Sequence, residues 1–218
     1  MASTDYSTLT GSTRGIDNDI AYNNARSAFD DSYRTDSFCN QSLDALVDIT
    51  AKTTCGGSGR DYGSLYTITG RNEGVTEFEF GMDWGRGGFL SLDIGGESEL
   101  FRLDEDIWWG RNWGNSDVFG LTLGEMGDFS LTLLGFEGCC DGINSVRYRS
   151  IATEGSLFET SFTAPGSRSR GRELQSLASD PGQWRALEVN DVPLPGSLPL
   201  VALGGLLLLQ RRRRNRAL

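Results

Sequence analysis

The sequence lacks histidine entirely, and Lys52 is its only lysine among 218 residues. Without an imidazole base, Ser-His-Asp and Cys-His nucleophilic systems are excluded, as are histidine-ligated zinc, non-haem iron and haem. A single lysine in a polar stretch disfavours a Schiff-base enzyme or a phosphate-loop NTPase. The 30 acidic side chains outnumber the 20 basic ones. We therefore expect no nucleic-acid partner, because such binding needs lysine and arginine to neutralise phosphates.

From about residue 62, apolar and polar side chains alternate with the period of two that is typical of half-buried strands. The apolar members are Phe78, Phe80, Met82, Leu90, Leu92, Ile94, Phe101, Leu103, Phe119, Leu121, Leu123, Phe129, Leu131, Leu133, Val146, Tyr148, Phe158 and Phe162. Glycine-rich turns separate these runs. The pattern predicts an all-β domain at 61–163, an antiparallel β-sandwich that buries phenylalanine and leucine between two sheets.

The segments on either side of this domain are more polar. We expect an irregular N-terminal segment at 1–60, partly packed on the sandwich, in which 25–33 and 43–49 are each a short helix or a strand. Turn signals and arginine at 164–191 predict a linker. The first ten residues have neither a basic nor an apolar region, so we expect an N-terminal signal peptide upstream of this chain.

The C-terminal tail, 192–218, differs sharply in charge from the rest. Residues 1–210 hold 15 basic and 30 acidic side chains, a net charge of −15, whereas the last eight residues carry +5. No charge occurs from Val192 to Leu209, and the prolines confine a transmembrane helix to about 198–210. The arginine cluster would keep the end of the tail in the cytoplasm. It comprises Arg211, Arg212, Arg213, Arg214 and Arg216.

This tail resembles the PEP-CTERM sorting signal in its VPLPA variant. The motif consists of Val192, Pro193, Leu194 and Pro195, and Gly196 stands where the variant usually has alanine. The resemblance implies a protein exported by a Gram-negative bacterium that makes exopolysaccharide. It also implies that an exosortase-type sorting protease removes the tail after the helix has held the protein in the inner membrane. The protein would then reach the cell surface or the extracellular space.

Export predicts that the four cysteines form disulfides. We expect Cys39–Cys55 together with a vicinal Cys139–Cys140 bridge. The alternative pairs Cys139 and Cys140 with Cys39 and Cys55, which would pin the N-terminal segment to the sandwich. A four-thiolate metal site is disfavoured because the sequence lacks CxxC pairs.

Residues 134–142, Leu-Gly-Phe-Glu-Gly-Cys-Cys-Asp-Gly, are the most distinctive in the body of the chain. Together with 80–88, Leu92-Asp93 and 106–109, they resemble the CCXG family of PEP-CTERM proteins. This likeness spans about 60–150 and implies a location rather than a reaction.

Residues 83–93 are also similar to the aspartate loop of PA14-type carbohydrate-binding sandwiches, which implies a jelly-roll arrangement. In some lectins of this type, loop acids hold Ca²⁺, which prefers oxygen ligands. The calcium candidates here are Asp83, Asp93, Asp141 and Asn144, and the alternative is that they bond to their own turns. No other cofactor is expected.

Four tryptophans lie close together in glycine-rich sequence: Trp84, Trp108, Trp109 and Trp113. Exposed rings would suit polysaccharide binding, while the alternative is packing in the core or against Arg86 and Arg111. Adjacent strand residues point to opposite sides, so at least one of Trp108 and Trp109 should be buried.

These features favour an exported, non-enzymatic surface or extracellular-matrix protein with a polysaccharide-binding or structural role. One alternative is a surface protein that remains anchored by its helix. Another is a secreted glycosidase-like enzyme that uses carboxylates such as Glu97, Glu99, Asp104 and Asp106.

Overall fold

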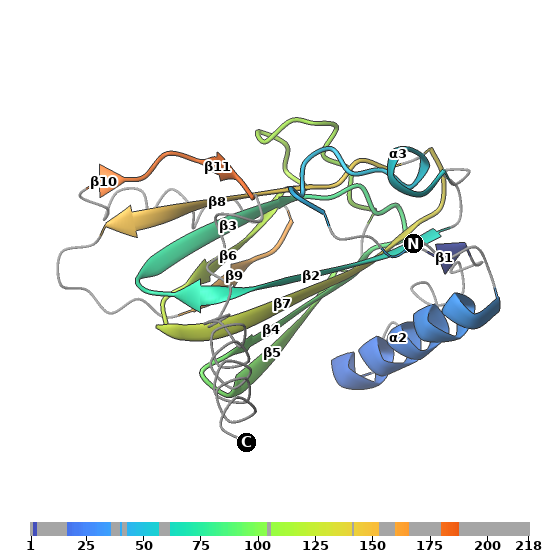
Figure 1. Cartoon of the computed structure of the whole chain (residues 1–218), viewed down its shortest axis with the longest axis horizontal. Coiled ribbons are helices and arrows are strands. Elements are labelled where there is room, and N and C mark those ends of the chain that lie inside the picture. Colours follow the sequence, from blue (N-terminus) through green and yellow to red (C-terminus); the bar gives the residue numbers. More distant parts are fainter. Residues whose placement is uncertain are drawn as a thin grey trace, which may run out of the picture.

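Two antiparallel β-sheets form the body of the protein in the computed structural model (Figure 1). The structure describes residues 2–3, 17–35, 40, 43–56, 62–103, 106–140, 142–152, 160–165 and 180–187. The first sheet has the order β1 (Ala2–Ser3), β2 (Tyr62–Asn72), β7 (Gly127–Glu137), β4 (Gly88–Ile94) and β5 (Glu97–Leu103). The second has the order β10 (Asp180–Pro181), β8 (Ser145–Ala152), β3 (Val75–Gly81), β6 (Phe119–Leu123) and β9 (Ser161–Thr163), and β11 (Arg185–Ala186) also pairs with β8. The predicted all-β architecture is thus confirmed.

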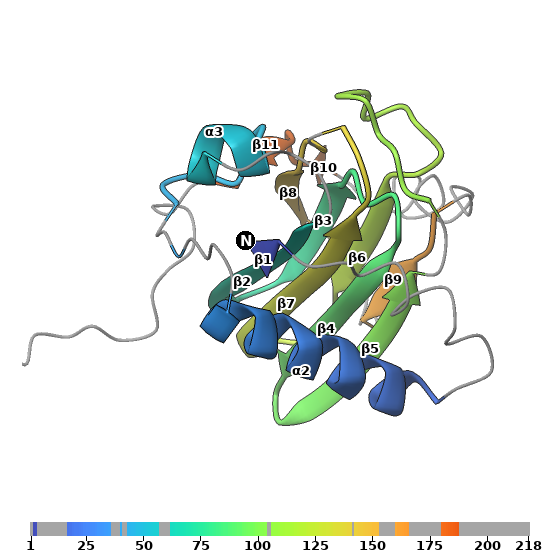
Figure 2. The ribbon, with the colours of Figure 1, turned by 90° about the vertical axis from the view of Figure 1, so that its right-hand side faces the viewer.

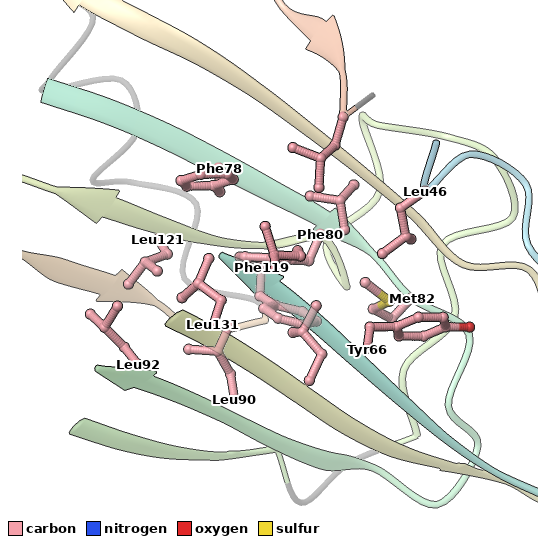
Figure 3. Packing of buried hydrophobic residues seen from close by; sticks show 14 of the residues in the cluster. Leu46, Tyr66, Phe78, Phe80, Met82, Leu90, Leu92, Phe119, Leu121 and Leu131 are labelled. Carbon is pink, nitrogen blue, oxygen red and sulfur yellow. The ribbon is translucent and has the colours of Figure 1, made fainter. Parts of the chain in front are cut away.

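The core lies between the two sheets and follows the period-two pattern (Figure 3). Phe78 and Phe80 of the second sheet and Leu90, Leu92 and Leu131 of the first are buried there. Every strand side chain predicted to face inward lies in this cluster or packs against it, apart from Phe158, which lies outside the described residues. The alternation is reliable because successive strand side chains point to opposite faces.

An 18-residue helix, α2 (Asn18–Thr35), covers the outer face of the first sheet (Figure 2). The Asp17 carboxylate accepts a hydrogen bond from Asp19 N at 3.0 Å, which caps the helix N-terminus. Ala21, Ala25 and Phe29 recur at intervals of four residues and pack against β4 and β7. The N-terminal segment is therefore more regular than predicted: 25–33, expected to be a short helix or a strand, belongs to this longer helix, which packs on the sandwich as predicted. Its apolar stripe is mostly alanine, so the sequence signal was weak.

Part of the segment between the sandwich and the tail belongs to the second sheet. Residues 180–187, expected to be part of a linker, contribute β10 and β11 to the edge of the second sheet. Leu187 is buried in the main core. The turn-forming residues in this stretch suggested a linker, but backbone pairing with β8 outweighs that local tendency.

The two ends of the sandwich differ in their connections. At one end, short turns join β2 to β3, β4 to β5 and β6 to β7. The β4–β5 turn uses Gly95 and Gly96 at φ of 60° and 91°, a conformation that favours glycine. At the other end, which we call the loop end, longer connections join β3 to β4, β5 to β6 and β7 to β8. The short helix α3 (Ala51–Cys55) follows Ile49, which bridges to Asn144 at this same end.

Among the described residues, no helix is both long and apolar enough to cross a bilayer. The predicted transmembrane helix, the sorting motif and the arginine cluster lie outside those residues.

Candidate binding site

The loop end is held together by backbone hydrogen bonds between its connections. Trp84 and Ile107 exchange two such bonds, at 2.9 and 3.2 Å, and so join the β3–β4 connection to the β5–β6 connection. Arg86 N donates to Phe136 O, and Phe136 N donates to Gly87 O, both at 3.0 Å. The loops are therefore fixed to the sheet edges and can hold side chains in defined positions, as ligand-binding loops on a rigid scaffold do.

Trp108 presents its indole ring to solvent from this fixed framework. The side chain is 58% exposed. Trp108 N donates to Asp117 Oδ2 at 3.0 Å, and Trp108 O accepts from Asn115 Nδ2 at 2.8 Å. The ring lies over Gly110, where an added Cβ would come within 2.8 Å of it. An exposed ring on a restrained backbone offers contact area at a low cost in conformational entropy.

The neighbouring Trp109 has a different role. It is only 2% exposed, its ring packs over Gly81, and its Nε1 donates to Ile143 O at 2.6 Å. Trp109 therefore ties the β5–β6 connection to the β7–β8 connection. The prediction that one of the two adjacent tryptophans is buried is confirmed.

The structure corrects the predicted ligand roles of Trp84 and Trp109. Trp84 is completely buried in the core, and its Nε1 donates to Ser64 Oγ at 3.2 Å. Neither ring has a free face for a sugar. Trp113 is half-buried and packs on Trp109, with ring centroids 4.6 Å apart. Trp108 is thus the member of the predicted set that offers an open ring.

Three acidic residues form a cluster at the loop end: Glu137 and Asp106 lie close to Gly85, and the charges of both act on Asp83. A Cβ added at Gly85 would lie 3.1 Å from Glu137 Oε1 and 3.6 Å from Asp106 Oδ1. The pKa of Asp83 is raised from 3.8 to about 7, chiefly by burial and then by the charges of Glu137 and Asp106, while a hydrogen bond from the Ile143 backbone opposes the change. Asp83 therefore holds its proton close to neutral pH.

Glu137 is a structural carboxylate. The residue is 3% exposed, and its oxygens accept backbone hydrogen bonds from Gly85, Gly138 and Cys139 at 3.0, 2.8 and 2.8 Å. These bonds fasten the β3–β4 connection to the turn that follows β7. Because Glu137 is committed to three amides, it is poorly placed to serve as a nucleophile or a general base. Glu137 was not singled out from the sequence, because acids in turns are common.

Of the predicted calcium ligands, the structure places Asp83 beside Asn144 and Asp93 far from both. Asn144 Oδ1 accepts from Asp83 N at 3.1 Å, and Asn144 Nδ2 donates to Tyr66 Oη at 3.1 Å, so this buried amide serves the fold. Asp93 bonds Ser98 and lies opposite Ser130. Ser130 is seven residues along β7 from Glu137, or roughly 23 Å at ~3.3 Å per residue. Asp141 lies outside the described residues, and among those that are described no three or more acidic or cysteine side chains are arranged so that they could hold a metal ion.

The β7–β8 connection contains a vicinal disulfide between Cys139 and Cys140, as in the first predicted pairing. Both residues are exposed, and Cys140 has φ of 77°. Tyr62 Oη donates to Gly142 O at 3.1 Å on the far side of the turn. Cys55 is also disulfide-bonded, but the predicted partner Cys39 lies outside the described residues. The turn beside Glu137 is therefore constrained by covalent and hydrogen bonds together.

Two acid–base pairs lie on the outer face of the second sheet. Glu77 is opposite Arg149, and Glu79 is opposite Arg147, on β3 and β8. Arg149 Nη2 lies 2.6 Å from Glu77 Oε2, and both side chains are nearly inaccessible. Burial raises the pKa of Glu77, and the positive charge of Arg149 counters part of this rise. The sequence signal for these two pairs was their spacing. Two glutamates stand two residues apart in β3, and two arginines stand two residues apart in β8.

Tryptophans cover these arginines in a Trp–Arg stack, which consists of Trp113, Arg147, Trp184 and Arg149. The Arg147 guanidinium lies 4.4 Å from the ring centroids of both Trp113 and Trp184, and that of Arg149 lies 4.4 Å from Trp184. Trp184 thus joins residues 180–187 to the sheet through two cation–π contacts. A large aromatic residue in an otherwise polar stretch could have indicated this docking.

The fold and the site define an antiparallel β-sandwich with a rigid, loop-built end and an exposed indole. Comparison with known proteins finds no matching family model, curated protein or solved structure. The family resemblances therefore rest on the residues quoted for them.

Proposed function

We propose that this chain is an exported, non-enzymatic bacterial surface or matrix protein. In this proposal, the sandwich binds polysaccharide through its loop end, and the C-terminal tail is an exosortase-type sorting signal. The observation that carries the binding role is Trp108, whose exposed ring stands on a hydrogen-bonded loop. Aromatic rings of this kind supply rigid, amphipathic contact area.

The finer fold assignment is a jelly roll of the PA14-like kind. Successive strands β2, β3 and β4 alternate between the two sheets, and so do β6, β7 and β8. The pairs β2–β7, β3–β8 and β3–β6 join strands distant in sequence, as nested Greek keys require. Loops gathered at one end of such a sandwich are a common location for ligand binding.

A non-enzymatic role is supported by the chemistry of the acidic cluster. Glu137 is occupied by three backbone amides, and the sequence provides no histidine as an alternative base. The proton that Asp83 retains near neutral pH reduces charge repulsion inside the loop end, which is a structural benefit.

The binding role can be tested with immobilised neutral, amino and acidic polysaccharides, with and without EDTA. Trp108→Ala should weaken binding roughly 30-fold, because the loss of a central aromatic anchor typically costs about 2 kcal/mol. Met126→Ala is the matched control, since Met126 is 75% exposed in the β6–β7 turn, at the end opposite the loop end, here called the turn end. If the wild type binds none of the polysaccharides, a structural role is the better account. If Trp108→Ala binds with the same affinity as the wild type, the binding site does not include Trp108.

The sorting role can be tested separately by mass spectrometry of the cell-bound and released protein. A product ending near residue 192 is expected from processing. An intact tail in the mature protein would favour permanent anchoring by the predicted helix at 198–210.

A further inference from the structure

We infer that residues 180–187, here called the strap, make the loop end face the membrane in the tail-anchored precursor. Polysaccharide binding would then begin only when the tail has been removed. The inference rests on the proposed function, and its new element is an orientation set by the fold. The partner of the loop end before processing is the lipid surface.

The strap is part of the folded sandwich. It pairs with β8 through β10 and β11, and Leu187 N donates to Val146 O at 3.1 Å. Leu187 O accepts from Leu46 N at 3.0 Å, and the Leu187 side chain is buried in the main core. The chain is therefore fixed to the domain as far as Leu187.

The Trp184 side chain also holds the strap against the second sheet. Its ring receives the guanidinium groups of both Arg147 and Arg149 at 4.4 Å, and these arginines are themselves held by Glu79 and Glu77. The strap thus has a side-chain anchor in addition to its backbone pairing.

The direction of the strap determines where the chain leaves the domain. β11 runs antiparallel to β8, and their arrows point in opposite directions in Figure 1. β8 begins with Ser145 at the loop end, and Leu187 lies beside Val146, the second residue of that strand. The polypeptide is therefore directed out of the loop end after Leu187.

Little chain remains between this exit and the bilayer. Ten residues, 188–197, precede the predicted helix. Fully extended, ten residues reach at most roughly 35 Å. The longest strands have 11 residues, or roughly 36 Å. Even at full extension, the tether does not exceed the length of these strands, so a lipid surface would restrict the access of a polymer to Trp108.

The single lysine allows the orientation to be measured. Lys52 lies in α3, after the segment that joins Asn144 at the loop end. A donor dye on Lys52, attached after the terminal amine is blocked, should transfer energy strongly to acceptor lipids in nanodiscs that hold the full chain. The control is Lys52→Arg combined with Met126→Lys, which moves the dye to the turn end and should give weaker transfer. Equal or reversed efficiencies would overturn the inference.

Two further variants connect orientation with binding. An insertion of about 20 Gly/Ser residues between 191 and 192 lengthens the tether without touching the strap and should abolish the difference in transfer. Trp184→Ala should reduce that difference, because it removes the side-chain anchor of the strap while the backbone pairing remains. A polysaccharide that binds the chain cut after residue 191 should bind the nanodisc-held chain at least tenfold more weakly, and the insertion should restore binding. Equal affinities for the cut and anchored forms would refute this masking.

The outcomes separate the two proposals. If energy transfer shows the loop end near the lipid but neither form binds any polysaccharide, the proposed function fails and the orientation stands. If both forms bind equally, the function stands and the inference fails.

Discussion

Replacing Arg149 with methionine tests the energetics of the Trp–Arg stack most directly. The side chains of Arg149 and Glu77 are only 5% and 9% exposed, with Arg149 Nε 2.7 Å and Nη2 2.6 Å from Glu77 Oε2. Removing one partner of such a pair leaves a buried charge and typically costs about 3–5 kcal/mol. The melting temperature should fall by about 6–20 °C, at roughly 2–4 °C per kcal/mol for a chain of this size.

The pH dependence of this loss follows from Glu77. Burial already raises its pKa, and Arg149 opposes that rise, so the variant should raise the pKa further. A raised carboxyl pKa stabilises the fold at low pH, and this contribution is lost as pH rises through the folded-state pKa. The deficit of Arg149→Met should therefore be larger at pH 8 than at pH 5. Urea denaturation followed by near-ultraviolet circular dichroism measures it at both values.

Two controls make the result decisive. Arg71→Met breaks an exposed pair with Asp128, at 3.1 Å and with side chains 56% and 61% accessible, and should cost less than about 1 kcal/mol. The double variant Glu77→Leu/Arg149→Met should recover most of the loss, because no unpaired charge remains buried. The reasoning is refuted if Arg149→Met costs no more than Arg71→Met, or if the double variant is no more stable than Arg149→Met.

Three other perturbations have defined outcomes. Trp184→Ala removes two cation–π contacts, should cost about 1–3 kcal/mol, and should raise amide hydrogen exchange in 180–187; unchanged exchange there would contradict the docking. Because the pKa of Asp83 is raised from 3.8 to about 7, this group stabilises the fold most at acid pH, and that contribution declines as pH rises to about 7; Asp83→Asn should flatten this slope in thermal melts, and an unaltered slope would exclude Asp83 as its source. Phe29→Ala empties the contact between α2 and the first sheet and should cost about 3–5 kcal/mol; a change below about 1 kcal/mol in urea would mean that the helix contributes little.

The strands and their inward faces were predictable because a period-two pattern is written in consecutive residues. Phe78 and Phe80 on one strand, and Leu90 and Leu92 on another, need no distant information to reveal a face. One of Trp108 and Trp109 is buried as predicted, but both lie in the β5–β6 connection and not in a strand, so contacts of Trp109 with Gly81 and Ile143 decide which ring is buried. Composition also determined the chemistry that is missing, since a chain without histidine cannot supply an imidazole.

The candidate site was only partly predictable, because its residues are brought together by contacts between distant segments. Trp84 and Trp108 occur in similar glycine-rich sequence, yet one ring is buried and the other exposed. The difference arises because β3 and β4 carry Trp84 into the core, whereas the ring of Trp108 lies over the outer side of its own loop at Gly110.

Sequence alone therefore determined the all-β class, the core-facing residues and the chemical character of the chain. Tertiary structure decided that a largely polar helix covers one sheet through a narrow alanine-lined face, that Glu137 holds three amides of the loop end, and that Trp184 docks on Arg147 and Arg149. The physical reason is the sequence separation of the interacting residues. Strand periodicity is a property of neighbouring residues, whereas the covering of a face or the pairing of a charge depends on which remote segment packs there.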